Sequence, residues 1–114
     1  MPCWQGMLNE TREIHSIIHR LSKFSMTYKI RILENAQDDL NWFRRNDKTS
    51  YIKCFDLVRE IVKDPRTGTG KPERLRYFEK EVYSRRINHK DRLIYTIYES
   101  LHEVDISSFR GHYD

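Results

Sequence analysis

The sequence predicts an α+β fold in which a small, mostly antiparallel β-sheet packs against two N-terminal α-helices. Three observations support this fold class. Apolar residues recur at helical spacing between residues 35 and 63. Three later segments are rich in β-branched and aromatic residues and are separated by short polar turns. With 114 residues, 38% of them hydrophobic and 33% charged, the chain suits one folded domain with a small core.

Two consecutive helices are expected, with a break at Asn46-Asp47 between them. Asn35 can cap the first helix, and Asp38 and Asp39 then lie in its first turn, where acids are favourable. The second helix should end before Asp64-Pro65, because proline disfavours helix in the residue before it. Its apolar stripe is expected to contain Tyr51, Phe55, Val58 and Val62, with Cys54 and Ile61 on the flank. The short connection predicts a helical hairpin.

Strands are expected both before and after these helices. Alternation from Tyr28 to Ile32 predicts an initial strand. Three further strands are predicted at Val82–Asn88, Arg92–Tyr98 and Val104–Phe109. The polar turns between them predict an antiparallel meander with one face packed on the helices. If the loop joining the first two of these three strands has an odd number of residues, Arg86 and Arg92 project from the same face.

Positive charge is concentrated in one segment. The whole chain carries a net charge of +4, whereas Arg66 to Arg92 contains nine cations and four acids, a net of +5. A focused basic face indicates a polyanionic partner, with nucleic acid as the first choice. From charge alone, a solvated surface with many salt bridges is the alternative.

Several other kinds of site are disfavoured by spacing. Cys3 and Cys54 form neither a CxxC motif nor a metal-binding pattern, and His15 and His19 lack a third ligand, so we expect no metal and no cofactor. Gly70-Lys71 lacks the first glycine and the Ser or Thr of a phosphate loop. The sequence has neither a signal peptide nor an apolar run of about 20 residues, and we expect a cytoplasmic protein.

A single acid, Glu73, lies within the basic loop. Glu73 and four other residues are candidates for a catalytic site, although each has an ordinary explanation when taken alone. Glu73 could neutralise a neighbouring cation, and a terminal His-Tyr is commonly a frayed end. Together the candidates meet the needs of RNA cleavage: a base for the 2′-hydroxyl, cations for the phosphorane charge, an acid for the leaving 5′-oxygen and an aromatic surface for a base. The candidates are Glu73, Arg86, Arg92, His112 and Tyr113.

Four separated blocks carry a family resemblance. They read GTGKPERLRY from Gly68, YSRRIN from Tyr83, DRLIYTI from Asp91 and GHY from Gly111. In this order and spacing they resemble the YoeB/Txe toxins of the RelE/ParE superfamily. The resemblance runs from about residue 26 to residue 113. It implies a microbial-RNase-like sheet packed by two helices, and a type II toxin–antitoxin endoribonuclease that cuts mRNA at the ribosomal A site.

The resemblance also implies roles for individual residues. Glu73 matches the general base, Arg92 the arginine that stabilises the phosphate, and His112 the general acid. Arg86 and Tyr113 match supporting active-site positions. We further expect three cations to bind substrate, namely Lys71, Arg76 and Arg85. The implied partners are mRNA on the ribosome and an antitoxin that blocks the site, with a homodimer or a toxin–antitoxin hetero-oligomer as the assembly.

Two alternatives remain open at the level of sequence. One is a non-catalytic ParE-like toxin that inhibits gyrase, and the other is an RNase that acts without ribosomes. Residues 1–25 have no counterpart in the family pattern, although Ile14, Ile17, Ile18 and Leu21 have helical spacing. We expect an N-terminal extension over 1–25, from a start site assigned too far upstream or as a helical arm, followed by a toxin domain over 26–114.

Overall fold

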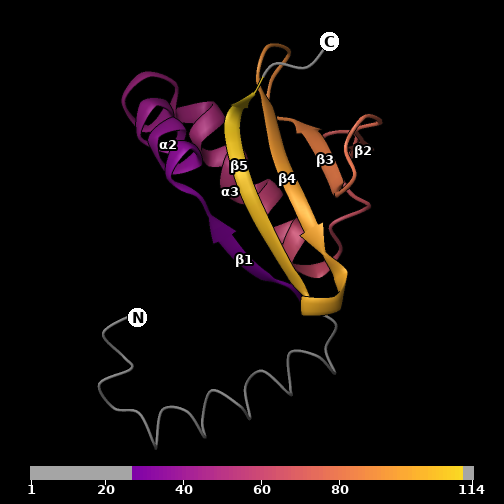
Figure 1. Cartoon of the computed structure of the whole chain (residues 1–114). Helices are drawn as coiled ribbons and strands as arrows, with labels where there is room; N and C mark the ends of the chain where they lie inside the picture. Colours follow the sequence, from indigo (N-terminus) through magenta and orange to yellow (C-terminus); the bar gives the residue numbers. More distant parts are fainter. Residues whose placement is uncertain (1–26, 112–114) are drawn as a thin grey trace, which may run out of the picture.

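The computed structural model describes residues 27–111, which form two α-helices and a five-stranded sheet (Figure 1). In chain order the elements are β1 (Lys29–Ile32), α2 (Glu34–Asn46), α3 (Lys48–Lys63), β2 (Glu73–Arg74), β3 (Glu81–Arg86), β4 (Arg92–Tyr98), the 3₁₀ turn η2 (Glu99–Leu101) and β5 (Glu103–Gly111). Within the described range, neither helix is long and apolar enough to cross a membrane. The helix expected within residues 1–25 lies outside this range.

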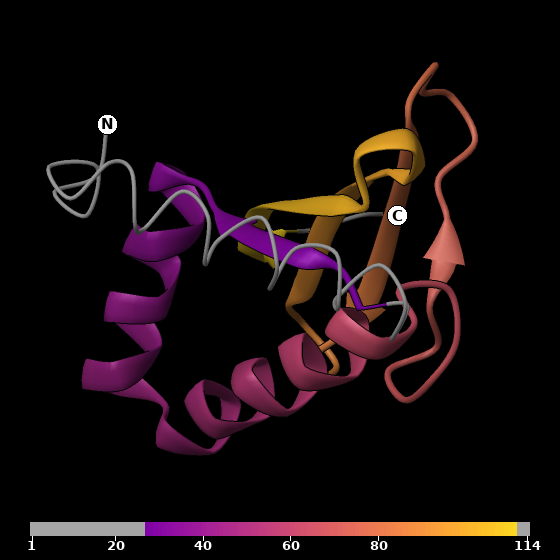
Figure 2. The ribbon, with the colours of Figure 1, turned by 90° about the horizontal axis from the view of Figure 1, so that it is seen from below.

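The sheet has the strand order β1-β5-β4-β3-β2. β3, β4 and β5 form the predicted antiparallel meander, β2 adds antiparallel to β3, and β1 pairs parallel with β5. Both helices lie on one face of the sheet, as Figures 1 and 2 show from two directions. The predicted α+β fold is confirmed.

The start of α2 differs from the expectation. Its N-cap is Leu33, which makes no side-chain cap hydrogen bond, and the helix begins at Glu34. The Leu33 amide donates to the carbonyl of Ile106 at 3.0 Å, so pairing with β5 holds the backbone extended up to the residue before the helix. Asn35 therefore lies inside the helix, and the cap predicted for it was wrong.

The connection between the helices forms a corner. Asp47 is both the C-cap of α2 and the N-cap of α3, and its side chain accepts hydrogen bonds from the amide and hydroxyl of Ser50. One shared residue leaves no loop in which the chain could reverse. Figure 2 shows the helices meeting at a wide angle, in contrast to the expected antiparallel hairpin. As predicted, α3 ends before Asp64-Pro65.

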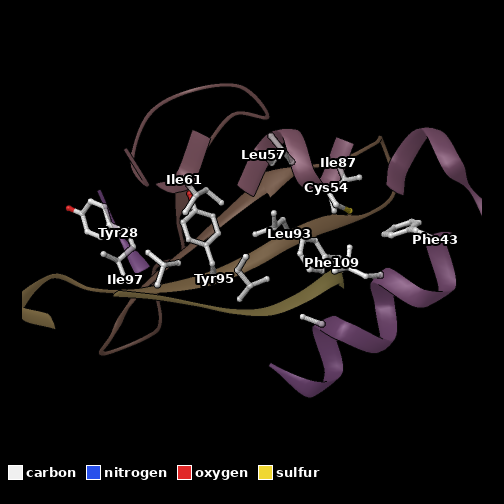
Figure 3. Packing of buried hydrophobic residues seen from close by; sticks show 14 residues of the cluster. Tyr28, Phe43, Cys54, Leu57, Ile61, Ile87, Leu93, Tyr95, Ile97 and Phe109 are labelled. Carbon is white, nitrogen blue, oxygen red and sulfur yellow. The ribbon is translucent and has the colours of Figure 1, made fainter. Parts of the chain in front are cut away.

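The core lies between the helices and the sheet, and Figure 3 shows its side chains. From β4, Leu93, Tyr95 and Ile97 are all buried, as their alternation predicts. The buried face of α3 differs from the predicted stripe, because it consists of Ser50, Cys54, Leu57 and Ile61, whereas Phe55 is 36% exposed. Ser50 faces inward because its hydroxyl bonds to Asp47 and accepts from Asn88, and a search for apolar periodicity passes over such a residue.

Candidate functional site

A groove of about 320 Å³ lies over β2, β3 and β4, on the sheet face away from the helices. It contains five of the predicted site residues, namely Lys71, Glu73, Arg76, Arg86 and Arg92. Its other lining residues are Arg74, Leu75, Tyr77 and Ser84. The loop and strands β2, β3 and β4 therefore supply one surface with a carboxylate and five cations.

Arg86 and Arg92 lie directly opposite each other in the β3–β4 ladder. The loop between the strands comprises residues 87–91, an odd number, so both arginines project from the same face as predicted. Like charges in directly opposite positions destabilise a sheet. Within residues 27–111, neither arginine is ion-paired with a carboxylate. This pair of cations is therefore available to an external anion.

Glu73 lies in the short strand β2, opposite Ser84 of β3. Its carboxylate is exposed, lines the groove and forms no ion pair with any residue between 27 and 111. Backbone bonds on both sides fix this segment, since Arg86 N donates to Gly70 O at 2.6 Å and Leu75 N donates to Val82 O at 2.8 Å. The carboxylate thus does not neutralise a neighbouring lysine or arginine in the described structure, and its position is set by the edge of the sheet.

Glycine is required in the loop that leads to Glu73. Gly68 and Gly70 have φ of 127° and 80°, and Lys71 also has a positive φ, of 50°. A Cβ at Gly70 would lie 2.9 Å from the carbonyl oxygen of Arg86, which belongs to β3 and cannot move without disturbing the sheet. Only glycine combines this backbone conformation with so close an approach.

Arg85 does not belong to the groove, and the substrate-binding role predicted for it was wrong. Side chains alternate along a strand, so Arg85 points to the opposite face from Ser84 and Arg86. It is fully buried, and its guanidinium binds Glu60, Tyr95 and backbone carbonyls of the 64–70 loop. No atom of its side chain is exposed to a substrate in the groove.

His112 and Tyr113 lie outside the described residues, and they follow directly after the end of β5 in the sequence. Gly111, the last residue of β5, is the register partner of Arg92. The Asp39 carboxylate of α2 accepts hydrogen bonds from the amides of Phe109 (2.9 Å) and Arg110 (3.1 Å), and from the hydroxyl of Ser108 (3.1 Å). The guanidinium of Arg110 also lies 3.7 Å from the ring centre of Trp42. Helix α2 therefore holds this strand end beside Arg92.

Sequence reasoning missed some of these contributors. Asp39 was expected only to favour the helix start, and nothing near it in the sequence indicates a partner 70 residues away. Tyr77 is 92% exposed and lines the groove, and Arg74 lies beside it. The available signal for both was their position inside the GTGKPERLRY block.

Two further observations on the described residues concern other kinds of site. Burial raises the pKa of the Cys54 thiol to about 12, so the thiol is not primed as a nucleophile. Residues 27–111 contain no group of three or more His, Cys, Asp or Glu side chains arranged to hold a metal. The groove instead offers one proton acceptor beside paired arginines, which suits a substrate that carries both a hydroxyl and a phosphate.

Comparison with known proteins gives one consistent result. A family model described as "YoeB-like toxin of bacterial type II toxin-antitoxin system" matches residues 32–113. The chain is 40% identical over 85 residues to Toxin YoeB of Synechocystis sp., which covers 75% of this chain and 96% of that protein. It is 31% identical over 80 residues to Toxin YoeB of Escherichia coli, which covers 70% of this chain and 93% of that protein.

Solved structures agree with the sequence relatives. A YoeB dimer from Staphylococcus aureus has a TM-score of 0.67 and 35% identity, and the match covers 76% of this chain and 99% of that chain. A heterotetrameric YoeB–YefM toxin–antitoxin complex from the same species has a TM-score of 0.64 and 36% identity, covering 75% of this chain and 98% of that chain. Since the family model spans well over half of the chain and these relatives are matched along nearly their whole length, the protein belongs to the YoeB-like toxins of bacterial type II toxin–antitoxin systems.

Proposed function

We propose that this toxin is a ribosome-dependent mRNA endoribonuclease that inhibits translation. The observation that carries the proposal is the convergence of Glu73, Arg86 and Arg92 on one groove, where the carboxylate and both cations lack ion-pair partners among residues 27–111. The arrangement combines a proton acceptor with charge stabilisation for a phosphodiester.

The proposed reaction is attack of an RNA 2′-hydroxyl on the adjacent phosphorus. Glu73 accepts the hydroxyl proton while the new O–P bond forms, and the bond to the 5′-oxygen breaks as His112 donates a proton to that oxygen. The products are a 2′,3′-cyclic phosphate and a 5′-hydroxyl. Arg92 and Arg86 stabilise the charge that builds on the nonbridging phosphate oxygens, which is the largest single contribution in comparable sites.

The remaining predicted residues bind and orient the RNA. Lys71 and Arg76 lie on the groove wall, where they can contact the phosphates on either side of the scissile one. Tyr113 offers a ring on which a base can stack. Most of the residues that line the groove are exposed, so the groove encloses a flexible strand only loosely, and we propose that the ribosome supplies the orientation by presenting the mRNA in its A site.

We also propose that an antitoxin covers this groove. The relative from Staphylococcus aureus has been solved with YefM, so a complex of this kind is established for that protein. An acidic antitoxin segment would complement the cations of the groove and associate quickly at low salt. Neutralising Arg86 or Arg92 should therefore weaken antitoxin binding and reduce its salt dependence.

The test of the proposed activity is single-turnover cleavage of mRNA bound to ribosomes, with analysis of the product ends. Glu73→Gln and His112→Gln should slow cleavage by roughly 10²- to 10⁴-fold. Arg92→Ala should slow it by at least about 10²-fold, because it removes charge stabilisation in the transition state. Arg31→Ala is the control, since Arg31 pairs with Asp105 near the opposite edge of the sheet and should leave the rate unchanged.

Four outcomes would contradict the proposal. Products ending in a 3′-hydroxyl would rule out attack by the 2′-hydroxyl. Full activity of both Glu73→Gln and His112→Gln would rule out the assigned acid and base. Equal cleavage of naked RNA would favour an RNase that acts without ribosomes, and absence of cleavage combined with inhibition of gyrase would favour the non-catalytic alternative.

A further inference from the structure

We infer that Arg85 is a positioning residue, which holds the 64–70 loop against α3 and β4 and thereby sets the place of Glu73 in the groove. The inference rests on the proposed function for the role of Glu73. It assigns Arg85 a part in the reaction although its side chain is fully buried and faces away from the substrate.

The guanidinium of Arg85 is completely satisfied. Its Nε donates to the Tyr95 hydroxyl at 2.9 Å, and Nη1 donates to Glu60 Oε1 at 3.1 Å and Thr69 O at 3.3 Å. Nη2 donates to the carbonyls of Thr67 at 2.7 Å and Asp64 at 3.1 Å. An arginine has five N–H donors, and these five bonds use all of them.

Three of those five bonds go to backbone carbonyls of one loop. Tyr95 adds a further hydrogen bond to the same loop, because its hydroxyl donates to the Pro65 carbonyl at 2.6 Å. Glu60 of α3 also binds the loop, because its carboxylate accepts hydrogen bonds from the amide and the hydroxyl of Thr69, each at 2.7 Å. The loop is therefore tied to a buried cation through the carbonyls of Asp64, Thr67 and Thr69.

This anchored loop leads directly into the catalytic segment. Thr69 is followed by Gly70, whose carbonyl accepts from the amide of Arg86, and Glu73 comes three residues later. Glycine adopts positive φ readily, so a free loop would sample the conformations of Gly68 and Gly70 among many others, and only the positive φ of Lys71 is unfavourable in itself. The bonds to Arg85 supply the restraint that selects them, so the position of Glu73 depends on a guanidinium on the other side of β3.

Lysine cannot replace arginine in this role. An ammonium is a point charge with three donors on a flexible stem, and it cannot reach three separated carbonyls together with Glu60 and Tyr95. Arg85→Lys therefore keeps the charge opposite Glu60 and removes most of the hydrogen bonds to the carbonyls of the loop. A displacement of about 1 Å remote from the chemistry can cost about 10²-fold in rate.

The experiment compares wild type, Arg85→Lys and Phe43→Leu by two readouts. Phe43→Leu is the stability control, because it weakens the core at the end far from Ile61 and the loop (Figure 3). The first readout is the single-turnover cleavage rate at saturating ribosome-bound mRNA, at a temperature where circular dichroism shows every variant folded. The second is amide hydrogen exchange of peptides covering residues 66–75.

We expect Arg85→Lys to lose about 10²-fold in the saturated rate, with faster exchange of this loop and little change in substrate affinity. Phe43→Leu should keep the wild-type cleavage rate and the wild-type hydrogen exchange of the loop, even where it is no more stable than Arg85→Lys. Tyr95→Phe removes one hydroxyl from the same network and should show a smaller loss in the same direction. If Arg85→Lys does not fold, Tyr95→Phe and Glu60→Gln decide by the same two readouts.

A wild-type rate and wild-type loop exchange in Arg85→Lys would overturn the inference. So would equal losses in Arg85→Lys and Phe43→Leu, which would reduce Arg85 to a stabilising residue. If wild type itself cleaves no RNA, the proposed function fails, and the exchange data alone then judge the anchor: faster loop exchange in Arg85→Lys supports it and unchanged exchange overturns it.

Discussion

Replacing Gly70 by alanine should destabilise the protein more than the addition of a single methyl group suggests. Gly70 has φ of 80°, and a Cβ there would lie 2.9 Å from Arg86 O, 3.2 Å from Arg86 N and 3.2 Å from Arg85 Cβ. The left-handed backbone costs an alanine about 1–2 kcal/mol. Overpacking against main chain that cannot retreat adds about 1–2 kcal/mol. We therefore expect Gly70→Ala to lower the free energy of unfolding by about 2–4 kcal/mol.

Urea denaturation followed by circular dichroism measures this loss. With a slope of about 1.5 kcal/mol/M, a loss of about 3 kcal/mol moves the midpoint by about 2 M. Gly111→Ala is the comparison for crowding without a left-handed backbone, because its φ is not in the left-handed region while its Cβ would lie 2.6 Å from Ile94 Cγ1 and 3.3 Å from Arg92 O. A midpoint for Gly70→Ala at or above that of Gly111→Ala would refute this account of the loop.

Three further predictions concern other regions. Asp39→Ala should lower the free energy of unfolding by about 1–3 kcal/mol and slow cleavage, because it removes the hydrogen bonds that hold the end of β5 beside Arg92. Urea denaturation measures the first effect and single-turnover assays the second. An unchanged rate would mean that Asp39 has no role in holding that strand end. The Cys54 thiol, whose pKa burial raises to about 12, should be alkylated at pH 8 at least about 100-fold more slowly in the folded protein than in urea, as followed by peptide mass spectrometry. Hydrogen bonds from Thr69 to Glu60 and from Arg66 to Glu81 hold the pKa values of both carboxyl groups below their usual range. The stability that these groups contribute is therefore present above the ordinary glutamate pKa and is lost as the pH falls through the lowered values of the folded protein. Thermal melts across the acid range check this, and a flat profile would contradict it.

The part of the site that local pattern specifies could be predicted from the sequence. Alternation places Leu93, Tyr95 and Ile97 on the core face. The odd number of residues in the loop between β3 and β4 places Arg86 and Arg92 on the same face of the sheet. Both inferences use only the twofold period of a strand. The same period also contains the signal that Arg85 faces the core, because it lies between Ser84 and Arg86, but its charge outweighed its position in the prediction.

Other features depend on contacts between residues distant in sequence. The bonds from Phe109 and Arg110 to Asp39 join segments that no local pattern relates. The N-cap at Leu33 depends on Ile106, which holds the preceding backbone extended. The inward face of α3 includes Ser50 because a partner in the β3–β4 loop, Asn88, satisfies its hydroxyl. Each of these was decided by tertiary structure over local preference.

The parallel pairing of β1 with β5 has a consequence for how the toxin is made. β1 begins at Lys29, whereas its partner in the ladder begins at Glu103, so β1 leaves the ribosome well before the strand that completes it. At about 5–20 residues per second, translation of the intervening segment takes about 4–15 seconds. During that time the core lacks Val104, Ile106 and Phe109, and β4 lacks its neighbour on one side. The sheet and the core of this protein are therefore completed only after β5 has been synthesised.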